Sequence, residues 1–93
     1  AKAAIEGLTV TLAAELAPSI RVNCIAPSLT DSKISQPMLK SEVVAEALAK
    51  AHPLKRIGKG SDSAGLAKFL LSDESSWLTG QIIGVDGGRS SLS

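Results

Sequence analysis

The sequence predicts an α/β fold with a parallel sheet, and three observations lead to this class. Two segments with strand patterns, 20–26 and 82–85, lie far apart in the chain, and two helical patterns separate them. A strand, a helical crossover and a second strand pair in parallel, almost always through a right-handed connection. The first strand pattern is apolar on both faces at its far end, which is typical of a sheet covered by helices. The expected order is helix, strand, loop, helix, helix, strand.

The N-terminal residues 1–17 predict a helix that ends at Pro18, because the residue before a proline is driven away from helical angles. Two stripes run along this helix. The first has helical spacing and is apolar, and the second consists of small side chains that allow close approach of another backbone. The small stripe has two open interpretations, packing on a sheet or a helix–helix contact in an oligomer. The apolar stripe is Ile5, Leu8, Leu12 and Leu16, and the small stripe is Ala3, Gly7, Thr11 and Ala14.

The strand at 20–26 is expected to stop at Pro27, and the polar segment 28–37 follows as a loop of a kind that often carries function. Asn23 is polar inside this strand. Its side chain either braces the following loop by hydrogen bonds or satisfies buried backbone groups, and we favour the second interpretation. Cys24 lies in the same strand, where a cysteine usually behaves as a small inert hydrophobe.

The second helix is expected at 41–51, with Ser41 as its N-cap, and His52 is interpreted as a helix-end residue. Ser61 is expected to cap the third helix, which has Asp62 in its first turn. The later segments are a set of short elements. They are an irregular stretch at 72–79, a strand at 82–85, a turn at 86–88 and a loose tail at 89–93.

Composition excludes several classes of protein. The 93 residues have a net charge of +1, whereas nucleic-acid-binding domains normally carry a large basic excess. The apolar runs are far shorter than the ~20 residues of a membrane-spanning helix. One cysteine and one histidine cannot form a closed zinc site of about four ligands, so no metal site is expected. A single cysteine also permits no internal disulfide, which favours the cytoplasm.

The chain begins at Ala1 and contains no tyrosine. Two parallel strands make a poor sheet on their own. We therefore expect residues 1–93 to be one segment of a larger α/β domain whose N-terminal part is missing.

Three blocks of sequence, in the same order, resemble the short-chain dehydrogenase/reductase family. The first block is Lys2-Ala3-Ala4, Leu8-Thr9 and Ala14 to Pro18, followed by Ile20 to Pro27; the second is Pro53-Leu54, Arg56, Gly58, Asp62, Ala64, Phe69-Leu70 and Ser72; the third is Thr79-Gly80-Gln81 with Val85 to Gly88.

The resemblance implies the C-terminal portion of a Rossmann-type doubly wound parallel sheet. Enzymes of this family transfer hydride between NAD or NADP and a carbonyl or alcohol substrate. The resemblance further implies a homo-oligomer, either dimer or tetramer, and a substrate-covering segment at about 33–51. The Gly-rich phosphate turn and the catalytic serine and tyrosine of the family all precede Lys2, so this chain alone is expected to be inactive.

The resemblance also implies the site residues. Lys2 corresponds to the family's catalytic lysine, which lowers the pKa of a tyrosine four residues earlier and binds the nicotinamide ribose. The segment from Pro27 to Ser32 corresponds to the loop that binds the nicotinamide carboxamide, through backbone groups near Thr30 and the Ser32 hydroxyl. The family usually has glycine where this chain has Ser28, which raises the question of whether the backbone there needs a positive φ.

A second hypothesis of a different class remains open. The chain can instead act as a non-catalytic assembly module that uses its small-residue stripe and short last strand to form oligomers. The two hypotheses differ in the expected partner. The enzyme hypothesis requires the missing N-terminal half, whereas the module requires copies of the same chain.

Overall fold

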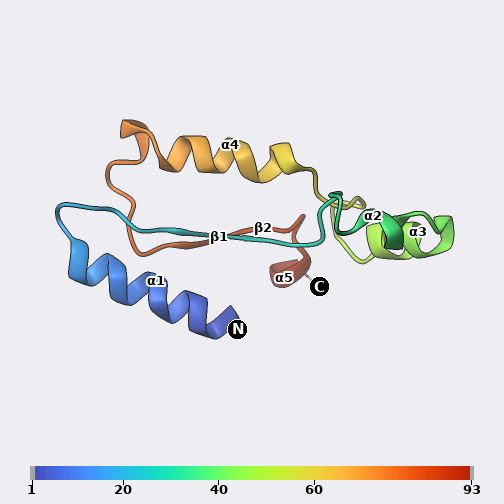
Figure 1. Cartoon of the computed structure of the whole chain (residues 1–93), viewed down its shortest axis with the longest axis horizontal. Helices are drawn as coiled ribbons and strands as arrows, with labels where there is room; N and C mark the ends of the chain where they lie inside the picture. Colours follow the sequence, from blue (N-terminus) through green and yellow to red (C-terminus); the bar gives the residue numbers. More distant parts are fainter. Residues whose placement is uncertain (1, 93) are drawn as a thin grey trace. The chain divides into compact units, whose positions relative to one another are not determined.

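The computed structural model of the chain describes residues 2–92, which form helices and two short strands (Figure 1). The residues group into two compact units. Unit 1 extends to residue 26 and includes 65–83, and unit 2 consists of 27–64 and the residues from 84 onward. The elements are α1 (Lys2–Leu16), β1 (Cys24–Pro27), α2 (Gln36–Leu39), α3 (Glu42–Lys50), α4 (Gly60–Leu70), the 3-10 turn η1 (Asp73–Ser75), β2 (Ile82–Val85) and α5 (Arg89–Leu92).

The strands β1 and β2 lie side by side in a two-stranded sheet (Figure 1), and they pair in parallel, as the sequence predicts. At one end the Cys24 N–H donates to the Gln81 carbonyl over 2.8 Å, and at the other the Ser28 N–H donates to the Val85 carbonyl over 3.3 Å. Both partners advance in the same direction along the chain, which defines the parallel register. The carboxyl ends of both strands therefore lie at the same edge of the sheet.

The first strand begins at Cys24 and is therefore shorter than predicted. The Val22 carbonyl still accepts from the Gly80 N–H over 2.7 Å, but the other bonds described here between residues 22–23 and the facing segment involve side chains. The Val22 N–H donates to the hydroxyl of Thr79 over 3.1 Å. The Asn23 amide donates to the Leu78 carbonyl over 3.2 Å and accepts from the Gln81 N–H over 3.0 Å. Opposite them Gly80 has a φ of +71°, which is incompatible with an extended strand. Asn23 thus satisfies backbone groups, as the sequence analysis expects.

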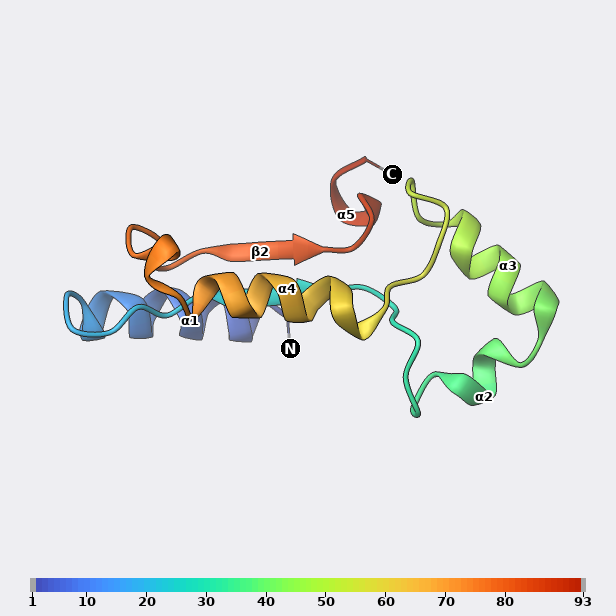
Figure 2. The same ribbon diagram turned by 90° about the horizontal axis from the view of Figure 1, so that it is seen from above.

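In unit 1, α1 and the later part of α4 lie on opposite sides of the strands (Figures 1 and 2). The predicted apolar stripe of α1 is not its buried face. Ile5 and Leu8 are 55% and 57% exposed, whereas Thr9 and Ala13 are buried. The small Ala13 faces Gly80, where a Cβ would lie 3.6 Å from the Ala13 Cβ. Close approach of the two backbones therefore selects small residues rather than leucines for this contact.

The half-buried Arg21, which precedes β1, joins its own segment to the end of α4 and to the 3-10 turn η1 within unit 1. One nitrogen, Nη1, donates to the carbonyl and the hydroxyl of Ser75 over 3.0 and 2.9 Å. The other, Nη2, donates to the Leu70 carbonyl over 3.0 Å and to the Ser72 carbonyl over 3.3 Å. Leu70 ends α4, so the guanidinium binds carbonyls that the helix itself leaves unpaired.

In unit 2, α2 and α3 pack against each other, and the Ser41 hydroxyl caps α3 by accepting from the Val44 N–H. The predicted helix at 41–51 is confirmed as Glu42–Lys50. The short α2 begins at the end of the predicted loop 28–37 and extends past it to Leu39. Pro37 occupies its first turn, where the missing N–H removes no helical hydrogen bond. The third helix begins at Gly60, so Ser61 is inside α4 rather than its cap. Instead, the Asp62 carboxylate accepts from the Lys59 N–H over 2.7 Å.

The tail is also more ordered than predicted, since residues 89–92 form α5. The Asp86 carboxylate accepts from the Gly88 N–H over 3.0 Å and from the Ser90 N–H over 3.3 Å, which caps this helical turn. Gly87 and Gly88 have φ values of +60° and +86°, so the predicted turn at 86–88 is confirmed. Across residues 2–92, no helix is long and apolar enough to cross a membrane.

Candidate functional site

The candidate site lies at the carboxyl end of β1, in the segment from Pro27 to Ser32, which belongs to unit 2. Ligands of open α/β sheets bind beyond this end of the strands. Pro27 is the last residue of β1 rather than the residue that stops it, and it is exposed. Ser28 and Thr30 are half-buried, and Ser32 is exposed. The middle of the segment thus faces the protein, while Pro27 and Ser32 at its two ends are exposed.

Ser28 contacts a histidine that sequence analysis assigns only to a helix end. Its hydroxyl lies 2.9 Å from Nε2 of His52, and Nδ1 of the same ring lies 2.8 Å from the Leu48 carbonyl oxygen. His52 is 1% exposed. The only non-glycine residue with a positive φ among those described is Lys55, so Ser28 adopts an ordinary backbone conformation. The substitution of serine for glycine therefore adds a hydrogen bond without backbone strain.

Thr30 forms a short parallel bridge with Gly58. The Gly58 N–H donates to the Leu29 carbonyl and the Asp31 N–H donates to the Gly58 carbonyl, each over 2.9 Å. This pattern leaves the Thr30 N–H and carbonyl outside the bridge, directed toward the opposite side of the segment. A Cβ at Gly58 would lie 3.0 Å from the Thr30 hydroxyl oxygen, so a side chain here would require Thr30 to shift.

Ser32 and Ser35 form reciprocal hydrogen bonds that resemble a capping box. The Ser32 N–H donates to the Ser35 hydroxyl over 2.9 Å, and the Ser35 N–H donates to the Ser32 hydroxyl over 3.3 Å. Ser35 is buried, and its hydroxyl donates to the Thr30 carbonyl over 2.6 Å. Ser35 therefore fixes the turn that carries Ser32, a role that sequence analysis did not assign to it.

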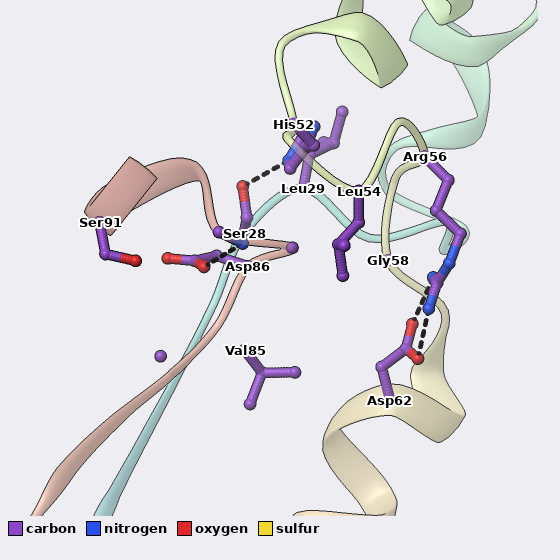
Figure 3. A pocket seen from close by; sticks show the side chains of 13 residues that line it. Ser28, Leu29, His52, Leu54, Arg56, Gly58, Asp62, Val85, Asp86 and Ser91 are labelled. Carbon is purple, nitrogen blue, oxygen red and sulfur yellow. Dashed lines mark hydrogen bonds and ion pairs between the residues drawn. The ribbon is translucent and has the colours of Figure 1, made fainter. Parts of the chain in front are cut away.

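A cavity of about 380 Å³ lies beside Ser28 and His52 in unit 2 (Figure 3). Its walls come from the end of β1, the residues after α3, the first turn of α4 and the end of β2 with its turn. Of the predicted site residues, Ser28 lines this cavity, whereas Pro27, Thr30 and Ser32 do not. Among residues 2–92, no group of three or more His, Cys, Asp or Glu side chains could bind a metal ion.

One wall of the cavity carries an ion pair between Arg56 and Asp62 (Figure 3). The guanidinium donates to both carboxylate oxygens over 2.8 and 2.9 Å. These hydrogen bonds, together with the one from the Lys59 N–H, hold the pKa of Asp62 well below its ordinary value, and they raise the pKa of Arg56. Asp62 therefore stays ionised, and the pair fixes the 54–60 turn to the start of α4.

Lys2 lies in the first turn of α1, in unit 1, and its side chain is exposed. The other four predicted site residues belong to unit 2. Hydrogen bonds of the bridge and of the capping turn join Thr30, Ser32 and Ser35, and Ser28 joins them through its carbonyl, which accepts from the Thr30 hydroxyl over 3.0 Å.

Comparison with known proteins yields consistent matches along nearly the whole chain. A family model described as enoyl-(acyl carrier protein) reductase matches residues 1–90. An uncharacterized oxidoreductase of Mycobacterium tuberculosis is 43% identical over 90 residues, which are 96% of this chain and 36% of that protein. Human dehydrogenase/reductase SDR family member 4 is 41% identical over 91 residues, 97% of this chain and 33% of that protein. The chain thus spans about a third of the length of these relatives.

Solved structures match in the same way. A putative gluconate dehydrogenase from Agrobacterium tumefaciens has a TM-score of 0.90 at 34% identity, covering 99% of this chain and 37% of that one. A putative 2-deoxy-D-gluconate 3-dehydrogenase from the same organism, with bound NADP, has a TM-score of 0.87 at 34% identity, covering 96% of this chain and 37% of that one. At these identities the likeness extends beyond the fold.

Proposed function

The chain belongs to the short-chain dehydrogenase/reductase family, and from this premise we propose that it forms the C-terminal part of an NAD(P)-dependent oxidoreductase. The proposed reaction is hydride transfer between the nicotinamide and a carbonyl or alcohol substrate. The observation that carries the proposal is the segment after β1, which is hydrogen-bonded along its length at the edge where ligands of such sheets bind.

The chemistry of this segment suits a nicotinamide carboxamide, which has one acceptor and two donors. The Thr30 N–H lies outside the Gly58 bridge and can donate to the carboxamide oxygen, and the Thr30 carbonyl has a second lone pair beside the one that Ser35 uses. The Ser32 hydroxyl supplies a further polar group, and Pro27 begins the segment. When bound, the cofactor donates or accepts the hydride, and these residues fix which face of its ring is presented to the substrate.

Lys2 is proposed to have two roles in the complete enzyme. Its ammonium would bind the ribose hydroxyls of the cofactor, and it would lower the pKa of a tyrosine supplied by the N-terminal segment. A phenol with a pKa of about 10 is a poor base at neutral pH, and a nearby positive charge favours its ionised form. The tyrosine could then exchange a proton with the substrate oxygen.

Residues 33–51, which include α2 and α3, are proposed to cover the substrate. Exposed apolar side chains support this assignment, since Ile34 is 94% exposed and Val43 is 79% exposed. A carbonyl or alcohol substrate with an apolar body could be bound by such side chains once the segment closes. The proposed setting is the cytoplasm, with a homo-oligomeric enzyme.

The first experiment measures the native and denatured masses of purified protein that contains this chain, followed by titration with NADH and NADPH. We expect the 9.5 kDa chain to require an N-terminal partner of roughly 15 kDa, either separate or in the same polypeptide, and only that form to bind cofactor and turn over substrate.

In the complete enzyme, Lys2→Met should abolish turnover, while Lys68→Met, at an exposed lysine of α4, should leave it unchanged. Turnover by the isolated 93-residue chain would contradict the proposal.

The assembly-module hypothesis is supported by a different observation, the exposed apolar side chains of α1. Ile5 and Leu8, which lie one turn apart on the same side of the helix, are each more than half exposed. Neighbouring exposed apolar side chains of this kind are typical of a surface that a partner covers. If the N-terminal segment covers it, this observation agrees with the enzyme. A symmetric oligomer made only of 9.5 kDa chains would instead support the module.

A further inference from the structure

We propose that His52 is a positioning residue that holds the cofactor-binding segment through the Ser28 hydroxyl, and so couples this segment to the end of α3. The inference rests on the proposed function, because it assigns a role to the segment from Pro27 to Ser32. The Ser28–His52 hydrogen bond is visible at the edge of the cavity (Figure 3).

The direction of the hydrogen bonds follows from the partners. The Leu48 carbonyl can only accept, so Nδ1 of His52 carries a proton and donates to it over 2.8 Å. In the neutral ring, Nε2 then has a lone pair and accepts a hydrogen bond from the Ser28 hydroxyl over 2.9 Å. The ring thus links the Leu48 carbonyl, in the last turn of α3, to the Ser28 hydroxyl, just after β1, through one hydrogen bond at each nitrogen. The two hydrogen bonds together fix the orientation of the imidazole.

His52 is itself immobilised by its surroundings. Its backbone N–H donates to the Ala49 carbonyl over 3.1 Å, and its carbonyl accepts from the Lys55 N–H over 2.8 Å. Beyond the ring, the Leu54 N–H donates to the Gly87 carbonyl over 3.1 Å, and a Cβ on Gly87 would lie 3.6 Å from the His52 Cβ. The position of the imidazole is therefore fixed by α3 and the 86–88 turn, and the Ser28 hydroxyl is held against a rigid partner.

Ser28 passes this restraint to the next residues. Its N–H is bonded to β2 through the Val85 carbonyl, and its own carbonyl accepts from the Thr30 hydroxyl over 3.0 Å. Thr30 is the residue whose backbone is proposed to meet the carboxamide. Ser28 is thus two residues from Thr30. Loss of the Ser28 hydroxyl would remove the hydrogen bond that attaches the segment to His52 and so make the segment more mobile.

The test compares Ser28→Ala with Ser28→Thr in the complete oxidoreductase. The threonine retains the hydroxyl, and the cavity beside Ser28 offers space for its methyl group. Ser91→Ala is the matched control, since it removes a hydroxyl from the same cavity without contact to His52. Two quantities are measured for each variant: the dissociation constant of NADH and NADPH, and amide hydrogen exchange of residues 27–35 in the cofactor-free protein.

For Ser28→Ala we expect roughly 3- to 10-fold weaker cofactor binding and faster exchange of residues 27–35, as for the loss of one hydrogen bond. Ser28→Thr and Ser91→Ala should match the wild type in both measurements. Unchanged hydrogen exchange in Ser28→Ala would overturn the proposal even if cofactor affinity falls. The lower affinity would then come from loss of a direct contact between Ser28 and the cofactor, and not from release of the segment. Absence of cofactor binding by the wild type would refute the proposed function, while hydrogen exchange would still decide whether the hydroxyl holds the segment.

Discussion

Replacement of Arg21 by methionine should destabilise the protein more than any ordinary surface substitution. Three hydrogen bonds of 3.0 Å or less join the guanidinium to Ser75 and Leu70. A hydrogen bond to a charged group contributes about 1.5–3 kcal/mol, and a cation near a helix C-terminus adds about 0.3–1 kcal/mol. Arg21 is half-buried, so water can replace part of what is lost. We therefore expect Arg21→Met to lower the free energy of unfolding by about 2–4 kcal/mol.

Arg21→Lys refines this prediction, because one ammonium cannot occupy the positions of both Nη1 and Nη2. We expect an intermediate loss, about half that of methionine. The assay is the urea dependence of unfolding of the complete oxidoreductase, together with hydrogen exchange of residues 70–79, which should accelerate in both variants. Lys68→Met serves as control, since it removes an exposed cation from the last turn of α4 and should change stability by less than about 1 kcal/mol. A loss within that range for Arg21→Met would refute the reasoning.

Two further predictions concern unit 2. The pKa of Asp62 is lowered in the folded state by the hydrogen bonds from Arg56 and Lys59, so its contribution to stability is present above the unfolded pKa of about 4 and is lost as the pH falls below that value. Thermal unfolding from pH 2 to 7 should therefore show Asp62→Asn destabilised at neutral pH and converging with the wild type in acid; a constant difference would contradict this. Gly87→Ala should lower stability by about 1–2 kcal/mol, because Gly87 has a φ of +60°. The matched Gly65→Ala, in the interior of α4 with no atom within 4 Å of the added Cβ, should instead stabilise the chain by about 0.5–1 kcal/mol, and equal effects of the two would argue against a backbone origin.

The sequence predicts the elements that have a clear periodic or apolar pattern, and it fails where a single side-chain contact or a close approach of two backbones decides. The regions of α1, α3 and β2 follow from helical spacing, a Ser41 cap and an apolar run, and the structure confirms them. The α5 turn was missed because it depends on capping by Asp86, which sequence analysis assigned to a turn alone. The buried side of α1 could not be chosen from the sequence either, since hydrophobicity does not reveal that Gly80 approaches Ala13 closely.

The candidate site shows the same division. The segment after β1 could be located by its place at the end of a strand and by its resemblance to a family. The Ser28–His52 contact could not, because the two residues are 24 positions apart and a helix end is the simpler interpretation of a histidine before proline. A buried histidine opposite an unexpected serine is recognised only when the structure brings them together. The roles of Lys2, Pro27, Thr30 and Ser32 in binding remain predictions for the experiments above.

The Thr30–Gly58 bridge and the bond from Ser28 to Val85 also have a consequence for biosynthesis. Both partners lie downstream of the segment they restrain, and Val85 ends β2. A ribosome therefore releases residues 27–32 well before it releases the strand that orders them. Until β2 emerges, the nascent chain lacks the Val85 carbonyl that accepts from the Ser28 N–H, so the segment reaches its final form only after β2 has been translated. Premature termination ahead of β2 would leave a chain with every predicted site residue but without the strand that holds Ser28.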